Sequence, residues 1–158
     1  FLLKMSMGYV ENRQQESLIL KRRIFWKRDD PSQLVQPVTD QKTFRVLQRY
    51  VEENIYVHES IIDYITEIVR FTRQHPVVEI GASPRGGLSL LKVARANAAI
   101  SGRTFVTPDD VKTFVYDALS HRIIMKMEYV LEGSFSPNAV LNEILEKVEV
   151  PKEFEGTR

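Results

Sequence analysis

Residues 83–111 read SPRGGLSLLKVARANAAISGRTFVTPDDV and contain one whole helix together with its two boundaries. Ser83-Pro84 marks the start, because a hydroxyl side chain can cap a free N–H and proline is tolerated at the first helical position. Gly102 marks the end. The apolar side chains between these points face all round the helix, which is typical of a helix in the middle of a bundle. The stretch therefore predicts a helical bundle with residues 85–101 at its centre.

The hydroxyl-proline start recurs at Thr107-Pro108 and at Ser136-Pro137, and it predicts two more helices. Asp110 follows Thr107 by three residues, which approximates a capping box. Apolar spacings of three and four predict three further helices in the first half of the chain. The six predicted helices cover residues 11–25, 42–54, 58–74, 85–101, 109–121 and 137–147.

The segments outside these helices are predicted to be extended or irregular. Residues 1–9 alternate loosely and predict a short strand, which would need partners from elsewhere. Residues 77–80 predict a short extended piece, and residues 125–129 a strand or hairpin arm. Residues 29–40 predict a connecting loop. The fold class is therefore mainly α, with about five or six helices, a leading strand and a short hairpin.

Composition limits the class of protein. The chain has 158 residues, 43% of them apolar, and its 22 Lys+Arg against 21 Asp+Glu give a net charge of +1, as in ordinary globular domains. The absence of cysteine excludes disulfides, thiolate zinc sites and a cysteine nucleophile. No apolar run approaches the roughly 20 residues of a membrane span. The chain opens on Phe1 in mid-pattern, and we expect it to be a fragment of a longer, cytoplasmic polypeptide.

Motif absences weigh against a complete active site. The sequence has no GxxxxGK[ST] phosphate loop, no GxGxxG and no HExxH, so neither an enzyme active site nor a metal site is predicted for the chain alone. His58, His75 and His121 lie far apart and are interpreted as structural or surface residues. Three pairs of adjacent acidic residues are interpreted as helix caps and solvated charge: Asp29/Asp30, Glu52/Glu53 and Asp109/Asp110.

One segment, residues 81–87 (GASPRGG), has the chemistry of an anion site. Arg85 stands in the first turn of a helix, where a cation is otherwise unfavourable and where free N–H groups and the helix dipole favour negative charge. Its glycine neighbours keep side chains out of the way, and Lys92 could extend the positive surface. A phosphate site formed by Ser83, Pro84, Arg85 and Gly86 is one interpretation, and an exposed arginine in an accidental neighbourhood is the other.

Several short motifs recur in register in residues 57–125. They are Phe71-Thr72-Arg73-Gln74-His75-Pro76, Ile80-Gly81-Ala82-Ser83-Pro84-Arg85-Gly86, Ala94-Arg95-Ala96-Asn97-Ala98, Ser101-Gly102-Arg103, Val106-Thr107-Pro108-Asp109-Asp110-Val111 and His121-Arg122-Ile123. In this order and spacing the chain resembles the C-terminal part of MoxR-type AAA+ ATPases. Residues 1–9 resemble the last strand of that family's nucleotide-binding core, with Val10 where a proline is usual, and residues 16–20 resemble the helix that leads into the lid.

The resemblance implies a domain organisation. Residues 1–10 would be the last strand of a truncated core, 11–150 the helical lid, and 151–158 a C-terminal tail. Arg85 would be the sensor arginine that touches the terminal phosphate of ATP, with Ser83, Pro84 and Gly86 beside it. The resemblance also implies ATP and magnesium in the parent protein, with no cofactor for the fragment alone.

The resemblance further implies the partners of the parent protein. These would be its own AAA+ core and neighbouring subunits in a hexamer, and proteins with von Willebrand factor A domains. No membrane or nucleic-acid partner is expected. The alternative function is a free-standing interaction module that binds nucleic acid. Residues 21–28 support it, since they hold five basic side chains and two aromatic ones, and residues 94–111 resemble histone-fold helices. The favoured interpretation of residues 21–28 is a solvated helix end, because cations are stabilised in the last turn of a helix.

Overall fold

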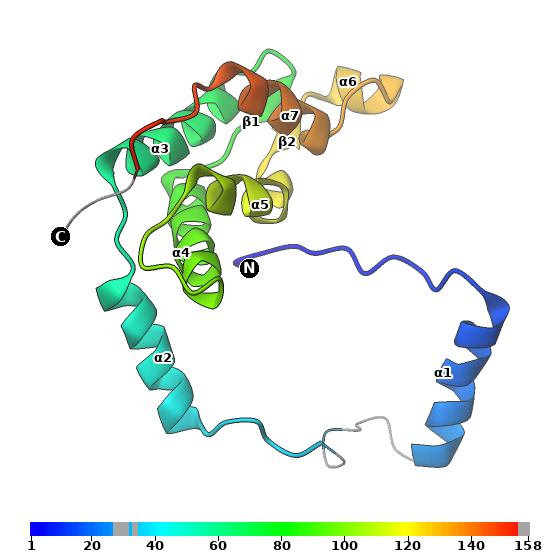
Figure 1. The fold of residues 1–158 in the computed structure, drawn as a ribbon. Coiled ribbons are helices and arrows are strands. Elements are labelled where there is room, and N and C mark those ends of the chain that lie inside the picture. Colours follow the sequence, from blue (N-terminus) through cyan, green and yellow to red (C-terminus); the bar gives the residue numbers. More distant parts are fainter. Residues whose placement is uncertain (27–31, 33–34, 155–158) are drawn as a thin grey trace. The chain divides into compact units, whose positions relative to one another are not determined.

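The computed structural model describes residues 1–26, 32 and 35–154, and its fold is mainly helical, as predicted (Figure 1). The elements are α1 (Arg13–Trp26), α2 (Gln41–Asn54), α3 (Glu59–Gln74), β1 (Val78–Ile80), α4 (Pro84–Ile100), α5 (Pro108–Leu119), η2 (Ser120–Arg122), β2 (Ile124–Met125), α6 (Met127–Glu132) and α7 (Pro137–Lys147). Parts of the predicted loop 29–40, of the basic stretch 21–28 and of the tail 151–158 lie outside the described residues. No helix among the described residues is long and apolar enough to cross a bilayer.

The chain divides into two compact units, and the larger one contains most of the predicted bundle. It consists of residues 1–5 and 48–158, and its central helix α4 packs against both α3 and α5 (Figure 1). The predicted central position of this helix is therefore confirmed. The core residues of α3, α4, α5 and α7 are Ile61, Tyr64, Ile65, Ile68, Val69, Leu90, Val93, Ala94, Ala98, Val111, Val115, Ala118, Leu119, Val140, Leu141 and Ile144.

The smaller unit, residues 6–47, holds α1 and the first half of α2. Neither helix buries a residue, and apolar side chains such as Ile24 and Phe44 are more than half exposed. Residues 1–10 form no strand here. The predicted strand needs a partner from outside this chain, so it stays a prediction. A strand is defined by a ladder of backbone hydrogen bonds. In this segment the described residues show one backbone bond to a distant residue, from Lys4 N to Asp117 O (2.8 Å), within the larger unit.

A two-stranded antiparallel sheet joins segments far apart in the sequence. Val78 of β1 pairs with Met125 of β2, and Lys126 N donates to Val77 O (3.0 Å). In the sequence α4 and α5 lie between the two strands, whereas the strands of a hairpin follow one another directly. The predicted hairpin is therefore wrong. The predicted strand 125–129 is confirmed only at Met125, because the chain turns into α6 from Met127 onward. Alternation over a few residues does not distinguish a strand from a short helix.

The three hydroxyl-proline starts are confirmed as helix boundaries, but only two of the hydroxyls cap. Thr107 accepts a hydrogen bond from Asp110 N, and Ser136 accepts one from Ala139 N. Ser83 makes no side-chain cap bond at the start of α4. The predicted capping role of this residue is therefore wrong, and its hydroxyl forms no hydrogen bond that the described residues show.

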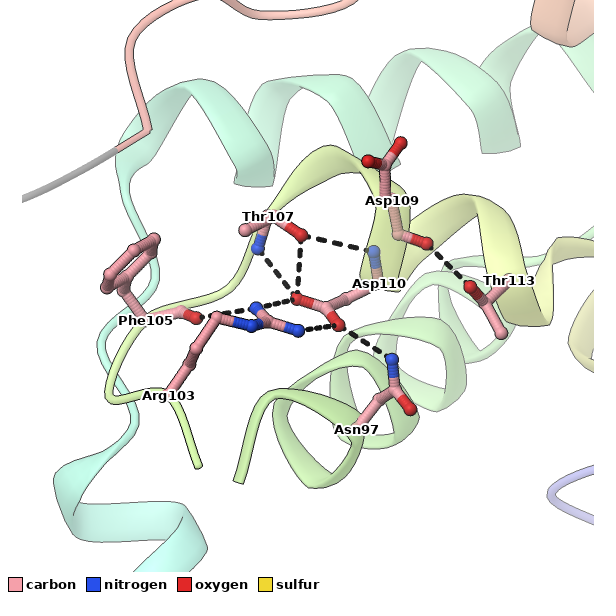
Figure 2. A network of polar contacts seen from close by, with 7 residues as sticks. All are labelled: Asn97, Arg103, Phe105, Thr107, Asp109, Asp110 and Thr113. Atoms are coloured by element: carbon pink, nitrogen blue, oxygen red, sulfur yellow. Dashed lines mark hydrogen bonds and ion pairs between the residues drawn. The ribbon is translucent and has the colours of Figure 1, made fainter. Parts of the chain in front are cut away.

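A buried carboxylate connects the end of α4 to the start of α5 (Figure 2). Asp110 is 1% exposed and accepts two hydrogen bonds from the guanidinium of Arg103, at 2.6 Å and 2.7 Å. It also accepts from Asn97 Nδ2 (2.7 Å) and from Thr107 N (2.8 Å), which completes the predicted capping box. The interpretation of Asp110 as part of a helix cap is confirmed, but its charge is buried and not solvated, whereas Asp109 beside it is exposed.

The pKa of Asp110 reflects two opposing effects. Burial raises it, because the ionised form is poorly solvated there. The hydrogen bonds from Arg103, Thr107 and Asn97 outweigh burial, and the pKa lies below its ordinary value. The folded state therefore holds this proton less tightly than the unfolded chain does, and the charged carboxylate stabilises the fold at neutral pH.

We expect Asp110→Asn to lower the free energy of unfolding at pH 7 by on the order of 2–3 kcal/mol, because the partly buried Arg103 loses its counter-charge. Asp109→Asn, at the exposed neighbour, should change it by less than about 0.5 kcal/mol. The stabilisation by Asp110 is present above the unfolded pKa and is lost as the pH falls through the lower folded pKa. The difference between wild type and Asp110→Asn in urea denaturation should therefore shrink below about pH 4. A difference that stays constant down to pH 2 would contradict this assignment.

Candidate functional site

The loop before α4 is pressed directly onto the backbone of α3. A Cβ atom built on Gly81 would lie 2.6 Å from Thr72 C and from Arg73 N, which is closer than real Cβ atoms approach other heavy atoms. Glycine is required here because the two backbones are in direct contact. The next residue, Ala82, is fully buried.

Thr72 links this loop to α3 by hydrogen bonds. It is fully buried, its Oγ1 accepts from Ala82 N (2.9 Å), and it donates to Val69 O (2.7 Å). A buried N–H without a partner costs about 1–3 kcal/mol, so this bond selects one position for the loop. Gly81 and Thr72 together determine where α4 begins.

The first turn of α4 is packed on its inner side. A Cβ on Gly86 would lie 3.0 Å from Leu119 Cδ2 and 3.4 Å from Arg122 Cδ, so a larger residue would push the turn away from α5 and η2. A Cβ on Gly87 would make ordinary contacts, 3.6 Å from side chains of α3. Of the two glycines predicted to keep side chains away from Arg85, only Gly86 stands at a tight contact.

Arg85 points outward from this turn. Its residue is exposed, and among the described residues no carboxylate forms an ion pair with it. Pro84 has no N–H, and Gly86 N bonds to Ser83 O (2.8 Å). The first-turn N–H of Arg85 has no acceptor within the helix. The first turn therefore carries a guanidinium, an N–H donor and the Ser83 hydroxyl at the positive end of a helix, and the described residues show no partner for any of them. This is the chemistry of an anion site.

An apolar groove adjoins the same turn, on the side that faces α3. It has a volume of about 220 Å³ and includes Pro84, Gly87 and Leu88 of α4. Ile62 of α3, predicted to be buried, lines this groove and is 47% exposed, so that prediction is wrong. A cationic turn and an apolar groove lie side by side on the larger unit.

The other residues singled out in the sequence lie away from Arg85 or have structural roles. Lys92 is exposed further along α4. His58 caps α3 by accepting from Ser60 N, and His75 Nε2 lies 3.2 Å from Glu143 Oε2, which confirms structural roles for both. Burial lowers the pKa of His121, so this side chain is neutral at neutral pH.

Residues 70–144 match the family model of the AAA lid domain. This match covers both α4 with its preceding loop and the Asp110 network. Together with the helical fold it defines the class: this is a helical AAA lid.

Relatives of known name specify the family further. Protein YeaC of Bacillus subtilis (strain 168) is 37% identical over 159 residues, which covers all of this chain and 48% of YeaC. Chaperone MoxR1 of Mycobacterium tuberculosis is 29% identical over 161 residues, 96% of this chain and 41% of MoxR1. The crystal structure of a candidate ATPase from Cytophaga hutchinsonii matches with a TM-score of 0.80 and 28% identity, over 96% of this chain and 47% of that one.

Together these matches support a MoxR-family AAA+ ATPase lid region. The chain spans about half the length of the curated relatives that it matches over its whole length. The lid match favours this family over the free-standing histone-like module, because the Gly81 to Gly87 segment lies within the matched residues.

We expect Gly81→Ala to destabilise the larger unit by more than about 2 kcal/mol, because the added methyl group would overlap the backbone of α3, which cannot yield as a side chain can. Gly87→Ala is the matched control. Its methyl group meets only ordinary contacts and alanine is the better helix former, so stability should stay the same or rise by up to about 1 kcal/mol. Chemical denaturation of both variants checks this, and equal effects would show that the contact at Gly81 is not tight.

Proposed function

We propose that this chain is the lid of a longer MoxR-like ATPase and that Arg85 contacts the terminal phosphate of ATP bound to the core of that protein. In this proposal residues 1–10 are the last strand of the core, and residues 11–150 form the lid. The single observation that carries it is the exposed guanidinium of Arg85, free of carboxylate partners among the described residues, on a turn whose position is determined by buried contacts.

The proposed role of Arg85 is electrostatic. A fixed cation stabilises the negative charge on the phosphoryl oxygens during transfer, and it gains most when its position needs no rearrangement. The Gly81 and Thr72 contacts supply that fixed position. The Arg85 N–H and the Ser83 hydroxyl are hydrogen-bond donors beside the same point, and Pro84 and Gly86 keep the turn compact.

A nucleotide suits this surface better than a bare anion does. Pro84, which precedes Arg85 in the sequence, and Gly87 and Leu88, which follow it, line the apolar groove. One ligand with an anionic group and a flat apolar group could therefore contact neighbouring parts of α4. ATP supplies the phosphoryl group that is transferred to water. Magnesium would be held by acidic residues of the core, since this chain contributes only donors and a cation to the site.

The family suggests the wider setting of this activity. We propose that the longer protein assembles into a hexameric ring in the cytoplasm and uses ATP to remodel or mature partner proteins with von Willebrand factor A domains. The support is the match to the AAA lid domain and the name of one relative, a chaperone.

We expect Arg85→Ala in the longer protein to reduce ATP turnover by on the order of a hundredfold, because one preorganised charge contact to the reacting group is lost. The fold should be unaffected, since the side chain is exposed and makes no ion pair with a described residue. Arg70→Ala is the matched control, because Arg70 is also exposed and lies on α3 in a surface ion pair with Glu67. Turnover close to that of the wild type in Arg85→Ala would remove Arg85 from the mechanism.

A further inference from the structure

Arg122 connects three parts of the larger unit. It ends η2, is partly buried, and its Nε donates to Ala118 O (2.8 Å). Its Nη2 donates to Ser89 Oγ (3.0 Å) and to Phe1 O (2.7 Å). Three well-formed hydrogen bonds hold the guanidinium in one orientation, which its planar fork of donors permits and a lysine ammonium would not reproduce.

The hydrogen bonds of Arg122 continue to Arg85. Ser89 is 7% exposed, and its Oγ donates to Arg85 O (2.9 Å), one turn earlier in α4. The aliphatic part of Arg122 covers the next residue, Gly86, where a Cβ would lie 3.4 Å from Arg122 Cδ. Arg122 therefore supports the turn of Arg85 both by a hydrogen-bonded relay and by direct packing.

Arg122 forms no ion pair with any described residue. All three of its acceptors are uncharged, whereas Arg103 in the same unit pairs with the buried carboxylate of Asp110. A partly buried arginine with neutral partners costs desolvation that a shorter amide side chain would avoid. This cost is understandable if the reach and the multiple donors of arginine are needed at this point.

We propose that Arg122 is a positioning residue for Arg85: it fixes the backbone of the first turn of α4 and ties that turn to the segment Phe1–Met5. This inference rests on the proposed function and names a residue through which Arg85 is held in place. The exposed guanidinium of Arg85 has only its backbone turn to orient it, and displacements of about 1 Å in such groups have large effects on catalysis. Movement of the Phe1–Met5 segment would therefore change the position of Arg85.

The test uses the longer protein and two ligands, a non-hydrolysable ATP analogue and ADP, which lacks the phosphate that Arg85 contacts. Arg122→Gln should weaken binding of the analogue by about five- to tenfold, the effect of one lost hydrogen bond, and leave ADP binding unchanged. Ser89→Ala, which removes only the hydroxyl relay, should act in the same direction and provides the test if Arg122→Gln does not fold. Arg70→Gln is the matched control and should affect neither ligand.

A double-mutant cycle decides whether Arg122 acts through Arg85. In an Arg85→Ala background, Arg122→Gln should have no further effect on the affinity for the analogue. Additive losses, an equal loss of ADP affinity, or no loss in Arg122→Gln and Ser89→Ala would each overturn the proposal.

Hydrogen exchange separates this proposal from the proposed function. If Arg85→Ala alone leaves the affinity for the analogue unchanged, the proposed function fails, and the support of the turn is then judged by amide exchange in residues 85–91. Faster exchange there in Arg122→Gln than in Arg70→Gln supports the fixing of the turn by Arg122. Equal exchange would overturn it.

Discussion

The contact between Gly81 and the backbone of α3 is the constraint on which the candidate site depends. Because a Cβ at this position would overlap Thr72 and Arg73, the chain can cross α3 only with glycine at the crossing point. The hydrogen bond from Ala82 N to Thr72 Oγ1 then fixes the position of the loop before α4 along α3. The direction of α4, and with it the place from which Arg85 projects, follows from these two contacts.

Two arginines of the larger unit illustrate how burial determines the role of a charge. Arg103 lies beyond the C-terminal end of α4 and is neutralised by Asp110, which is 1% exposed, so its charge serves the connection to α5. Arg85 lies at the opposite end, is exposed, and has no carboxylate partner among the described residues. The first stabilises the scaffold, and the second is available to an external anion. The hydrogen bonds of Asp110 fix the C-terminal end of α4, and the contacts of Thr72 with the preceding loop fix its N-terminal end. Arg85 therefore stands on a rigid element.

Local sequence signals predicted much of this fold, and non-local contacts explain most of what they missed. Helix starts at Pro84, Pro108 and Pro137 and the capping box at Thr107 depend on neighbours within a few residues, and all were confirmed. The pairing of β1 with β2 and the bond from Ala82 to Thr72 join distant residues, and no pattern indicated them. Ile62 has the spacing of a core residue, yet it lies where α3 and α4 leave a groove. The motif around Arg85 identified the candidate cation, whereas Arg122, 37 positions further on, stood in the motif His121-Arg122-Ile123 but had no role predicted for it.

In the proposed mechanism Arg85 contacts the terminal phosphate of a bound nucleotide when lid and core are together. The most direct measurement is a crystal structure of the longer protein with a non-hydrolysable ATP analogue. We expect a guanidinium nitrogen of Arg85 within roughly 2.7–3.2 Å of a γ-phosphate oxygen, with the loop from Gly81 to Ser83 packed on α3 as in the isolated lid. A γ-phosphate held entirely by other residues, with Arg85 turned toward solvent, would contradict this mechanism.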